Sequence, residues 1–124
     1  MITIDIEFTT KTVIGLSEAK VYKCEYDGYG EHIDDMVKWV RKAITNDNVR
    51  RPMITFSYWD DNRKCDVSTA RIIGEYCDTY DLVTWDDRGN VTSKLEKVKP
   101  DARLIKRLYW DNVRRLEAIE EAVV

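Results

Sequence analysis

The residues best suited to chemistry in this chain are tryptophans followed directly by acids. The tripeptide Trp-Asp-Asp or a close copy occurs three times at nearly even spacing, at Trp59-Asp60-Asp61, Trp85-Asp86-Asp87 and Trp110-Asp111-Asn112. These copies hold three of the four tryptophans. Large aromatic side chains beside charge are the residues most often used as anchors in recognition. The pattern therefore indicates binding.

The aspartates of the first two copies also have a simpler explanation. Both copies stand where a predicted strand ends and a turn begins, and an aspartate side chain at such a place caps its own turn. An internal repeat would need support from more than three residues. We therefore favour repeated turn chemistry as the reason for the similarity.

The inventory for catalysis is small. His32 is the only histidine, and no cysteine or serine is placed beside it by the sequence, so we expect a solvated or capping side chain there. An enzyme that uses His32 with a cysteine is the alternative. The acid pairs could bind a hard cation such as Mg²⁺, but adjacent residues of a strand or helix point in different directions. No glycine-rich phosphate loop is present. We expect no enzymatic activity, no cofactor and no metal.

The three cysteines do not form a recognisable framework. Cys24, Cys65 and Cys77 are odd in number and far apart, and no Cys-x-x-Cys motif occurs. This argues against a disulfide scaffold and against a zinc site. We expect reduced thiols that are buried in strands as small hydrophobic side chains.

The composition is that of one globular domain. The chain has 124 residues, of which 44% are apolar and 35% charged, with a formal net charge of −3. This length suffices for a core of its own without disulfides or metal. Acids in segment 1–7 stand where a signal peptide needs basic residues, and no stretch approaches the length of a membrane span. We expect a cytoplasmic protein, in its own cell or in a host cell, without membrane contact.

Periodicity predicts two strands and a helix in segment 1–48. Residues 3–14 and 19–26 alternate between apolar and polar side chains, and the turn at 15–17 joins them into an antiparallel hairpin. Apolar residues recur at helical spacing over 31–45, with acids in the first turn and bases in the last, which is typical of an amphipathic helix.

The remainder predicts a β-rich part, 49–99, and a C-terminal helix, 100–124. Strands are expected at 53–59, 67–76, 80–85 and 91–98, and a helix at 102–122 with Asp101 as its N-cap. The fold class is therefore α+β. We expect a strongly bent antiparallel sheet or an SH3-like small barrel, with an N-terminal hairpin and two helices in a single domain.

The two sides of the predicted C-terminal helix differ in character. At 100° per residue, one side is apolar apart from Asn112, which could set a pairing register or bond within the core. The opposite side carries a basic stripe, defined as Arg103, Lys106, Arg107, Trp110 and Arg114. The stripe could hold phosphates and stack a base, or it could receive an acidic protein surface with Trp110 as anchor. Alternatively, the bases only solvate this side and Trp110 packs under the N-terminal hairpin.

One family resemblance covers residues 49 to 105. The segments Ile54-Thr55-Phe56-Ser57-Tyr58, Ala70-Arg71-Ile72-Ile73 and Tyr80-Asp81-Leu82-Val83 resemble the strand series of WYL domains, which are SH3-like barrels of bacterial and phage-defence regulators. Tyr58 and Arg71 match that family's first-strand tyrosine and second-strand arginine. The proline after the arginine is absent here, and Thr79-Tyr80-Asp81-Leu82 replaces the tripeptide that names the family. The resemblance implies a regulator that binds nucleic acid or a small ligand.

Two functions remain. The first is a small non-enzymatic protein-interaction module, of the kind that a phage or mobile element uses to occupy a host protein's working surface. Its contacts would be the basic stripe or the acidic-aromatic turn ends, which are Trp59, Asp60, Asp61, Trp85, Asp86 and Asp87. The alternative is the WYL-like regulator, with nucleic acid bound through the C-terminal helix.

Overall fold

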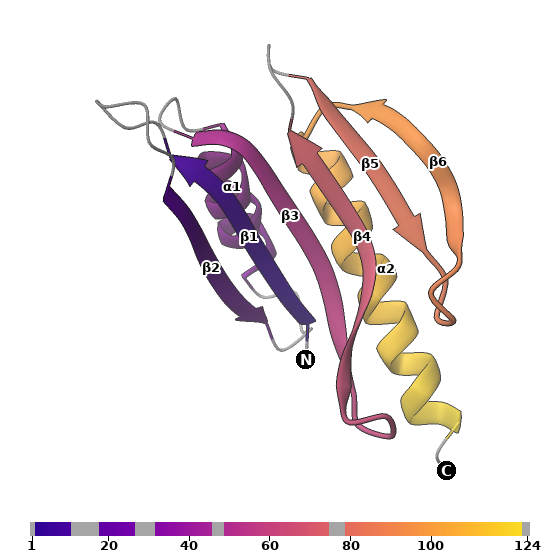
Figure 1. Ribbon diagram of the computed structural model, residues 1–124. Helices are drawn as coiled ribbons and strands as arrows, with labels where there is room; N and C mark the ends of the chain where they lie inside the picture. Colours follow the sequence, from indigo (N-terminus) through magenta and orange to yellow (C-terminus); the bar gives the residue numbers. More distant parts are fainter. Residues whose placement is uncertain (1, 11–17, 27–31, 46–48, 75–78, 123–124) are drawn as a thin grey trace.

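The computed structural model describes residues 2–10, 18–26, 32–45, 49–74 and 79–122. These residues form a six-stranded sheet and two helices (Figure 1). The elements in chain order are β1 (Ile2–Thr10), β2 (Glu18–Tyr26), α1 (Ile33–Ile44), β3 (Val49–Asp60), β4 (Cys65–Gly74), β5 (Tyr80–Trp85), β6 (Val91–Val98) and α2 (Ala102–Ala122).

The predicted α+β class, with a bent antiparallel sheet and two helices, is confirmed. The strand order is β2-β1-β3-β4-β5-β6, and every neighbouring pair is antiparallel. β2 and β6 lie at opposite edges of this order, so the sheet is the open form of the two that the sequence allowed. The predicted N-terminal hairpin is the β1–β2 pair, whereas its turn lies outside the described residues.

Both helices pack on the same face of the sheet and contact each other (Figure 1). Because side chains alternate along a strand, every second residue points toward the helices. The helix-facing side chains of the strands include Ile2, Ile4, Ile6, Ile54, Phe56, Ile72 and Leu82, and all are buried. They form one core with Met36, Val37 and Val40 of α1 and with Leu104, Ile105, Leu108, Tyr109 and Val113 of α2. The apolar side predicted for α2 is thus confirmed.

A β-bulge ties α2 to the centre of the sheet. Phe56 pairs with Ala70 and Ser57 with Ser68, so Thr69 is an extra residue on β4. A bulge redirects the side chain of the extra residue. Here the Thr69 side chain is buried and lies within hydrogen-bond distance of the Phe56 carbonyl, at 3.2 Å, and of Asn112 Oδ1 on α2. Asn112 therefore bonds within the core, which answers one question that the sequence left open.

The orientation of the Asn112 amide decides which hydrogen bonds it forms with Thr69. Among the described residues, its Nδ2 is the one buried side-chain nitrogen or oxygen without a hydrogen-bond partner. The Thr69 hydroxyl has a single proton but two acceptors in reach. With the amide turned by 180°, Nδ2 donates to the hydroxyl and the hydroxyl donates to Phe56. That orientation pairs both donors, and we favour it.

A close backbone approach fixes one end of β3 against β4. The pairing of β1 with β3 shifts between Glu7 and Thr9, and Pro52 lies at this irregularity, where a strand tolerates the missing N–H. A Cβ atom added to Gly74 of β4 would stand 2.6 Å from Pro52 Cδ and 2.7 Å from Pro52 Cγ. Glycine is therefore required at position 74 by space.

In the part of the chain that the structure describes, neither helix is long and apolar enough to span a membrane.

Candidate partner-binding surfaces

The first aspartate of each turn copy caps its own turn. Asp60 Oδ1 accepts hydrogen bonds from the backbone N–H groups two and three positions later, at 2.9 and 3.2 Å. Asp86 Oδ1 accepts from the N–H groups two and four positions later, both at 2.9 Å. The hydrogen bond from the Asn90 N–H lowers the pKa of Asp86, with a smaller contribution from the Arg88 N–H. The structure thus has the repeated turn chemistry that the sequence favoured.

The second aspartates of the two turn copies have different roles. Asp61 is exposed, and its Oδ1 accepts a hydrogen bond from the Trp59 indole Nε1 at 3.0 Å. This bond, together with Lys64 Nζ at 3.6 Å, lowers the pKa of Asp61. Asp87 instead accepts a hydrogen bond from the Tyr58 hydroxyl at 3.2 Å.

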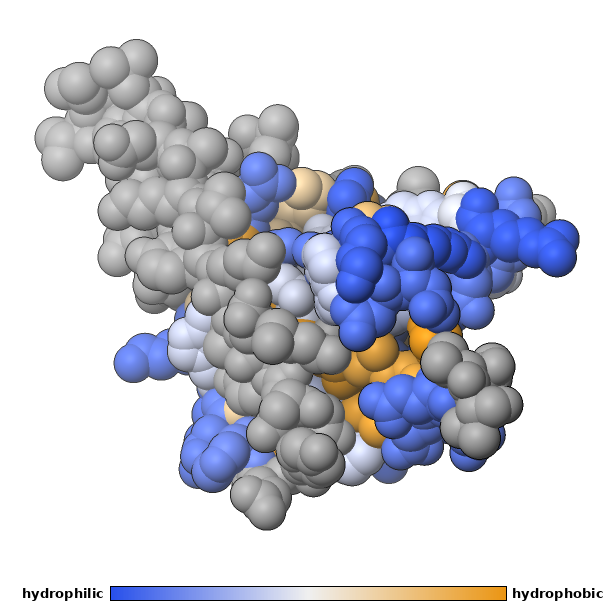
Figure 2. Space-filling view, turned by 90° about the horizontal axis from the view of Figure 1, so that it is seen from below, coloured by the Kyte–Doolittle hydropathy of each residue, from blue (hydrophilic) through white to orange (hydrophobic). Residues whose placement is uncertain are grey.

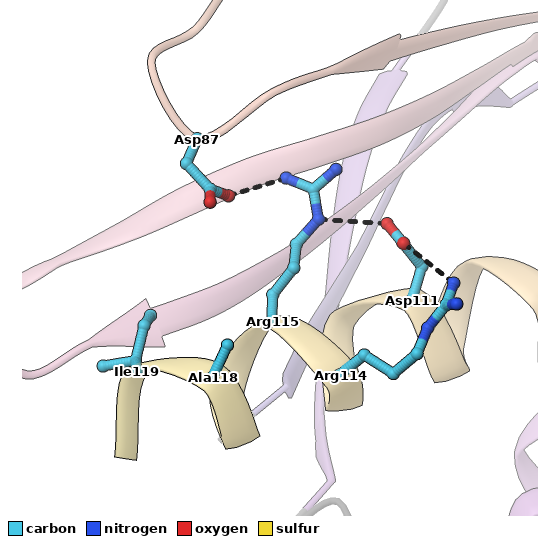
Figure 3. Close-up of a pocket in the computed structure, with 6 residues that line it drawn as sticks. All are labelled: Asp87, Asp111, Arg114, Arg115, Ala118 and Ile119. Atoms are coloured by element: carbon cyan, nitrogen blue, oxygen red, sulfur yellow. Dashed lines mark hydrogen bonds and ion pairs between the residues drawn. The ribbon is translucent and has the colours of Figure 1, made fainter. Parts of the chain in front are cut away.

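Arg115 of α2 joins the second copy of the tripeptide to the third. Its Nη1 lies 2.8 Å from Asp87 Oδ1, and its Nε lies 3.0 Å from Asp111 Oδ2 (Figure 3). Its Nη2 also donates to the Trp85 carbonyl at 3.0 Å. Asp111 and Arg115 stand four positions apart on α2, so their pairing is local, whereas Asp87 comes from the distant β5–β6 turn. No signal in the sequence links positions 87 and 115, because their contact depends on how α2 crosses the sheet.

Arg63 makes the corresponding link between the first copy and the second. Its Nη1 donates to the Asp87 carbonyl at 2.8 Å, and its Nε lies 3.3 Å from Asp60 Oδ2. All three copies therefore meet at the end of the molecule where the β3–β4 and β5–β6 turns lie beside α2 (Figure 1). We call Asp60, Arg63, Asp87, Asp111 and Arg115 the arginine network.

An open pocket lies beside this network. It is lined by Asp87, Asp111, Arg114, Arg115, Ala118 and Ile119 (Figure 3). Seen from this end, hydrophobic surface is exposed between strongly hydrophilic regions (Figure 2). The charged groups of the pocket are paired with one another, Arg114 Nη2 lying 3.1 Å from Asp111 Oδ1. The described lining therefore offers ion pairs and an apolar edge, and it holds no histidine, cysteine, serine or threonine that could act as a nucleophile.

The basic stripe is exposed on the outer side of α2. Trp110 keeps 43% of its surface accessible, and its ring meets Tyr109 edge to face at 5.5 Å. The alternative in which Trp110 packs under the N-terminal hairpin is therefore wrong. Lys106 Nζ reaches Asp34 Oδ1 of α1 at 3.1 Å. None of the described residues forms an ion pair with Arg103 or Arg107, so their charges face solvent.

The charge order of α2 opposes its helix dipole. α1 has Asp34 and Asp35 in its first turn and bases in its last turn, as the dipole prefers. α2 has no acid in its first turn and no base in its last turn. Its N-cap is nevertheless the predicted one, since Asp101 Oδ1 accepts from the Leu104 N–H at 2.9 Å. The positive end of the dipole and the bases of the stripe reinforce each other.

The three tryptophans of the copies lie on two different layers. Trp59 and Trp85 belong to the helix-free face of the sheet, because Tyr58 and Leu82 point toward the helices and side chains alternate. Trp59 is 39% exposed, whereas Trp85 is half-buried beneath the Arg71 guanidinium, which stands 5.4 Å from the ring centroid. Trp110 lies on the helix layer. The predicted contacts therefore form two separate surfaces.

The remaining candidates for chemistry are isolated. His32 is the exposed N-cap residue of α1 and makes no side-chain capping bond, as expected for a solvated histidine. The prediction of a buried Cys65 is wrong, because this cysteine is exposed at the start of β4, next to the β3–β4 turn. The side chains of Cys24 and Cys77 lie outside the described residues. Among the residues that are described, no group of three or more potential ligands could hold a metal ion.

In comparisons with known proteins, no family model, no curated protein and no solved structure matches this chain. The resemblance to WYL domains therefore stays a prediction.

Proposed function

We propose that this chain is a small non-enzymatic protein-interaction module that binds an acidic surface of its partner through the basic stripe. The observation that carries the proposal is Trp110, a large aromatic side chain left 43% exposed among arginines. A role as a phage or mobile-element inhibitor, in which the stripe occupies the working surface of a host protein, fits this mode of binding.

The expected energetics favour the stripe over the turn ends. Covering the exposed part of Trp110, roughly 100 Å², would contribute about 2–3 kcal/mol to binding. Arg103 and Arg107 are not engaged by described residues, so a partner's carboxylates gain ion pairs without displacing existing ones. In contrast, Asp60, Asp86 and Asp87 already accept hydrogen bonds within the fold. Lys106 and Arg114 of the stripe are paired with Asp34 and Asp111, so Arg103, Arg107 and Trp110 are its groups that remain available.

The charge order of α2 supports the same conclusion. A base in the first turn of a helix, such as Arg103 in α2, costs about 0.3–1 kcal/mol relative to an acid there. α1 of the same chain follows the favourable order, so the chain is not indifferent to this effect. A stripe that costs stability and faces solvent is explained by a partner that uses it.

The test is affinity capture of the tagged protein from lysate, with and without nuclease, followed by mass spectrometry. We expect a protein partner that survives nuclease and is retained at least tenfold less by Trp110→Ala and by Arg103→Glu/Arg107→Glu. The matched control is Lys38→Glu/Arg41→Glu, which makes the same charge change on exposed positions of α1. Unchanged retention by both stripe variants would remove the proposal.

The second candidate is a nucleic-acid-binding regulator, as the WYL resemblance implies. The observation in its favour is that the same stripe places bases on both sides of an exposed indole, which is how single strands are held by phosphate contacts and stacking. It predicts affinity that falls steeply with salt, and Arg107→Glu and Arg114→Glu that lower both affinity and salt slope. Loss of all partners on nuclease treatment would favour this candidate.

A further inference from the structure

On the helix-free face of the sheet, one tryptophan is in contact with a cationic side chain of the same chain. The Arg71 guanidinium lies over the Trp85 ring at 5.4 Å, and Arg71 Nε donates to Thr55 Oγ1 at 3.1 Å. A cation over an indole is attracted by the negative face of the ring, and tryptophan gives the strongest such interaction. The indole of the second tripeptide copy is therefore already occupied by an arginine of the same chain.

Trp59 is the counterpart of Trp85 in the first copy. Both stand at the end of a strand, directly before the aspartate that caps the turn, and both point to the helix-free face. Trp59 remains 39% exposed, and no cation of the described residues lies over its ring. This indole has the position of Trp85, but no arginine of the described residues covers it.

The surroundings of Trp59 carry negative charge in a fixed position. Asp61 Oδ1 is held by the Trp59 indole N–H at 3.0 Å, which places a carboxylate at the ring edge. Asp66, also exposed, is the cross-strand neighbour of Trp59. Lys64 Nζ lies 3.6 Å from Asp61 Oδ1. A phosphate would be repelled by these acids, whereas a cation would be attracted by both ring and carboxylate.

We propose that Trp59, with Asp61, binds an arginine side chain presented by a partner, with the guanidinium over the indole and its N–H groups toward the Asp61 carboxylate. Arginine suits this arrangement better than lysine, because its planar guanidinium stacks on an aromatic face while its N–H groups point sideways to a carboxylate. This surface lies on the strand layer and attracts the opposite charge to the basic stripe. It is independent of the function proposed for α2.

The test uses the indole N–H signals in a ¹H–¹⁵N spectrum of the full chain, which has four tryptophans. The probe is the peptide acetyl-Gly-Arg-Gly-amide, and its neutral isostere with citrulline is the control. We expect the Trp59 signal to move saturably with the arginine peptide, with a Kd of roughly millimolar order, and the Trp85 and Trp110 signals to stay. Citrulline should move the Trp59 signal little.

Three variants separate this binding mode from non-specific attraction. Asp61→Asn should weaken binding about three- to tenfold, Trp59→Phe should weaken it about as much, and Trp59→Leu should abolish it. Binding to the variants that lack the indole is read from the backbone amides of Asp61 and Asp66. Equal shifts with the citrulline peptide, no shift of the Trp59 signal, or undiminished binding by Trp59→Leu would each overturn the proposal. Arg103→Glu/Arg107→Glu should leave this titration unchanged, so the two proposals fail separately.

Discussion

Removal of the Arg115 guanidinium is the sharpest test of how the three tripeptide copies are held together. Arg115→Met removes three hydrogen bonds and keeps the apolar stem. The side chain is 21% exposed, and it donates to two partly exposed carboxylates and to the Trp85 carbonyl. We assign about 0.5 kcal/mol to each ion pair, because solvent screens them, and about 1 kcal/mol to the hydrogen bond to the carbonyl. The expected loss is therefore about 2 kcal/mol.

This loss is large enough to measure by thermal unfolding. A chain of 124 residues has an unfolding entropy of about 0.26 kcal/mol/K, so the Tm should fall by about 8 °C. The matched control is Arg114→Met, because Arg114 is 73% exposed and contacts only Asp111 among the described residues. Its Tm should fall by no more than about 2 °C.

A double-mutant cycle locates the effect. Asp87→Asn combined with Arg115→Met should cost less than the sum of the single variants, by about 0.5–1 kcal/mol, because both remove the same 2.8 Å contact. If Arg115→Met lowered the Tm no more than Arg114→Met, or if the coupling were zero, the network would not hold α2 to the β5–β6 turn.

Two further predictions concern Tyr58 and Gly74. Burial, followed by the Asp87 charge, raises the pKa of Tyr58 to about 12, from an ordinary value of 10.0. The folded state then holds the proton more tightly, so the contribution of Tyr58 to stability is complete below pH 10 and is lost as the pH rises to 12. In chemical unfolding across this range, the free energy of unfolding should decline less for Tyr58→Phe than for the unsubstituted chain. An identical decline would refute the assignment. Gly74→Ala should cost about 1–3 kcal/mol by overpacking against the Pro52 ring, and Pro52→Ala should relieve part of that cost; equal cost in both backgrounds would show that the ring is not the obstacle.

Periodicity was enough to predict most of the elements. Apolar side chains alternate along a strand and recur every 3.6 residues along a helix, and this pattern reports which face is buried. The predicted helix 102–122 matches α2, and the predicted strands 80–85 and 91–98 match β5 and β6. The Asp101 N-cap could also be predicted, because the capping bond joins residues that are close together in the sequence.

Contacts between distant elements could not be predicted in this way. The order β2-β1-β3 places the N-terminal hairpin beside β3, although nothing in the alternation of residues 3–14 selects that edge. The pairing of Asp87 with Arg115 depends on the same long-range placement. Cys65 was misassigned because burial at a strand end depends on which other element covers it, and the alternation of residues along the strand does not report that; the structure shows Cys65 exposed.

In the tripeptide copies the aspartates have structural roles, whereas the exposed tryptophans do not. Turn capping explains Asp60 and Asp86, and the arginine network explains Asp87 and Asp111. Neither role needs a tryptophan. Trp85 is covered by Arg71, whereas Trp59 and Trp110 are left open on opposite layers, beside acids in one case and bases in the other. A residue chosen only for folding would not be an exposed indole, so the two open tryptophans are best explained by partners, and their opposite surroundings call for partner surfaces of opposite charge.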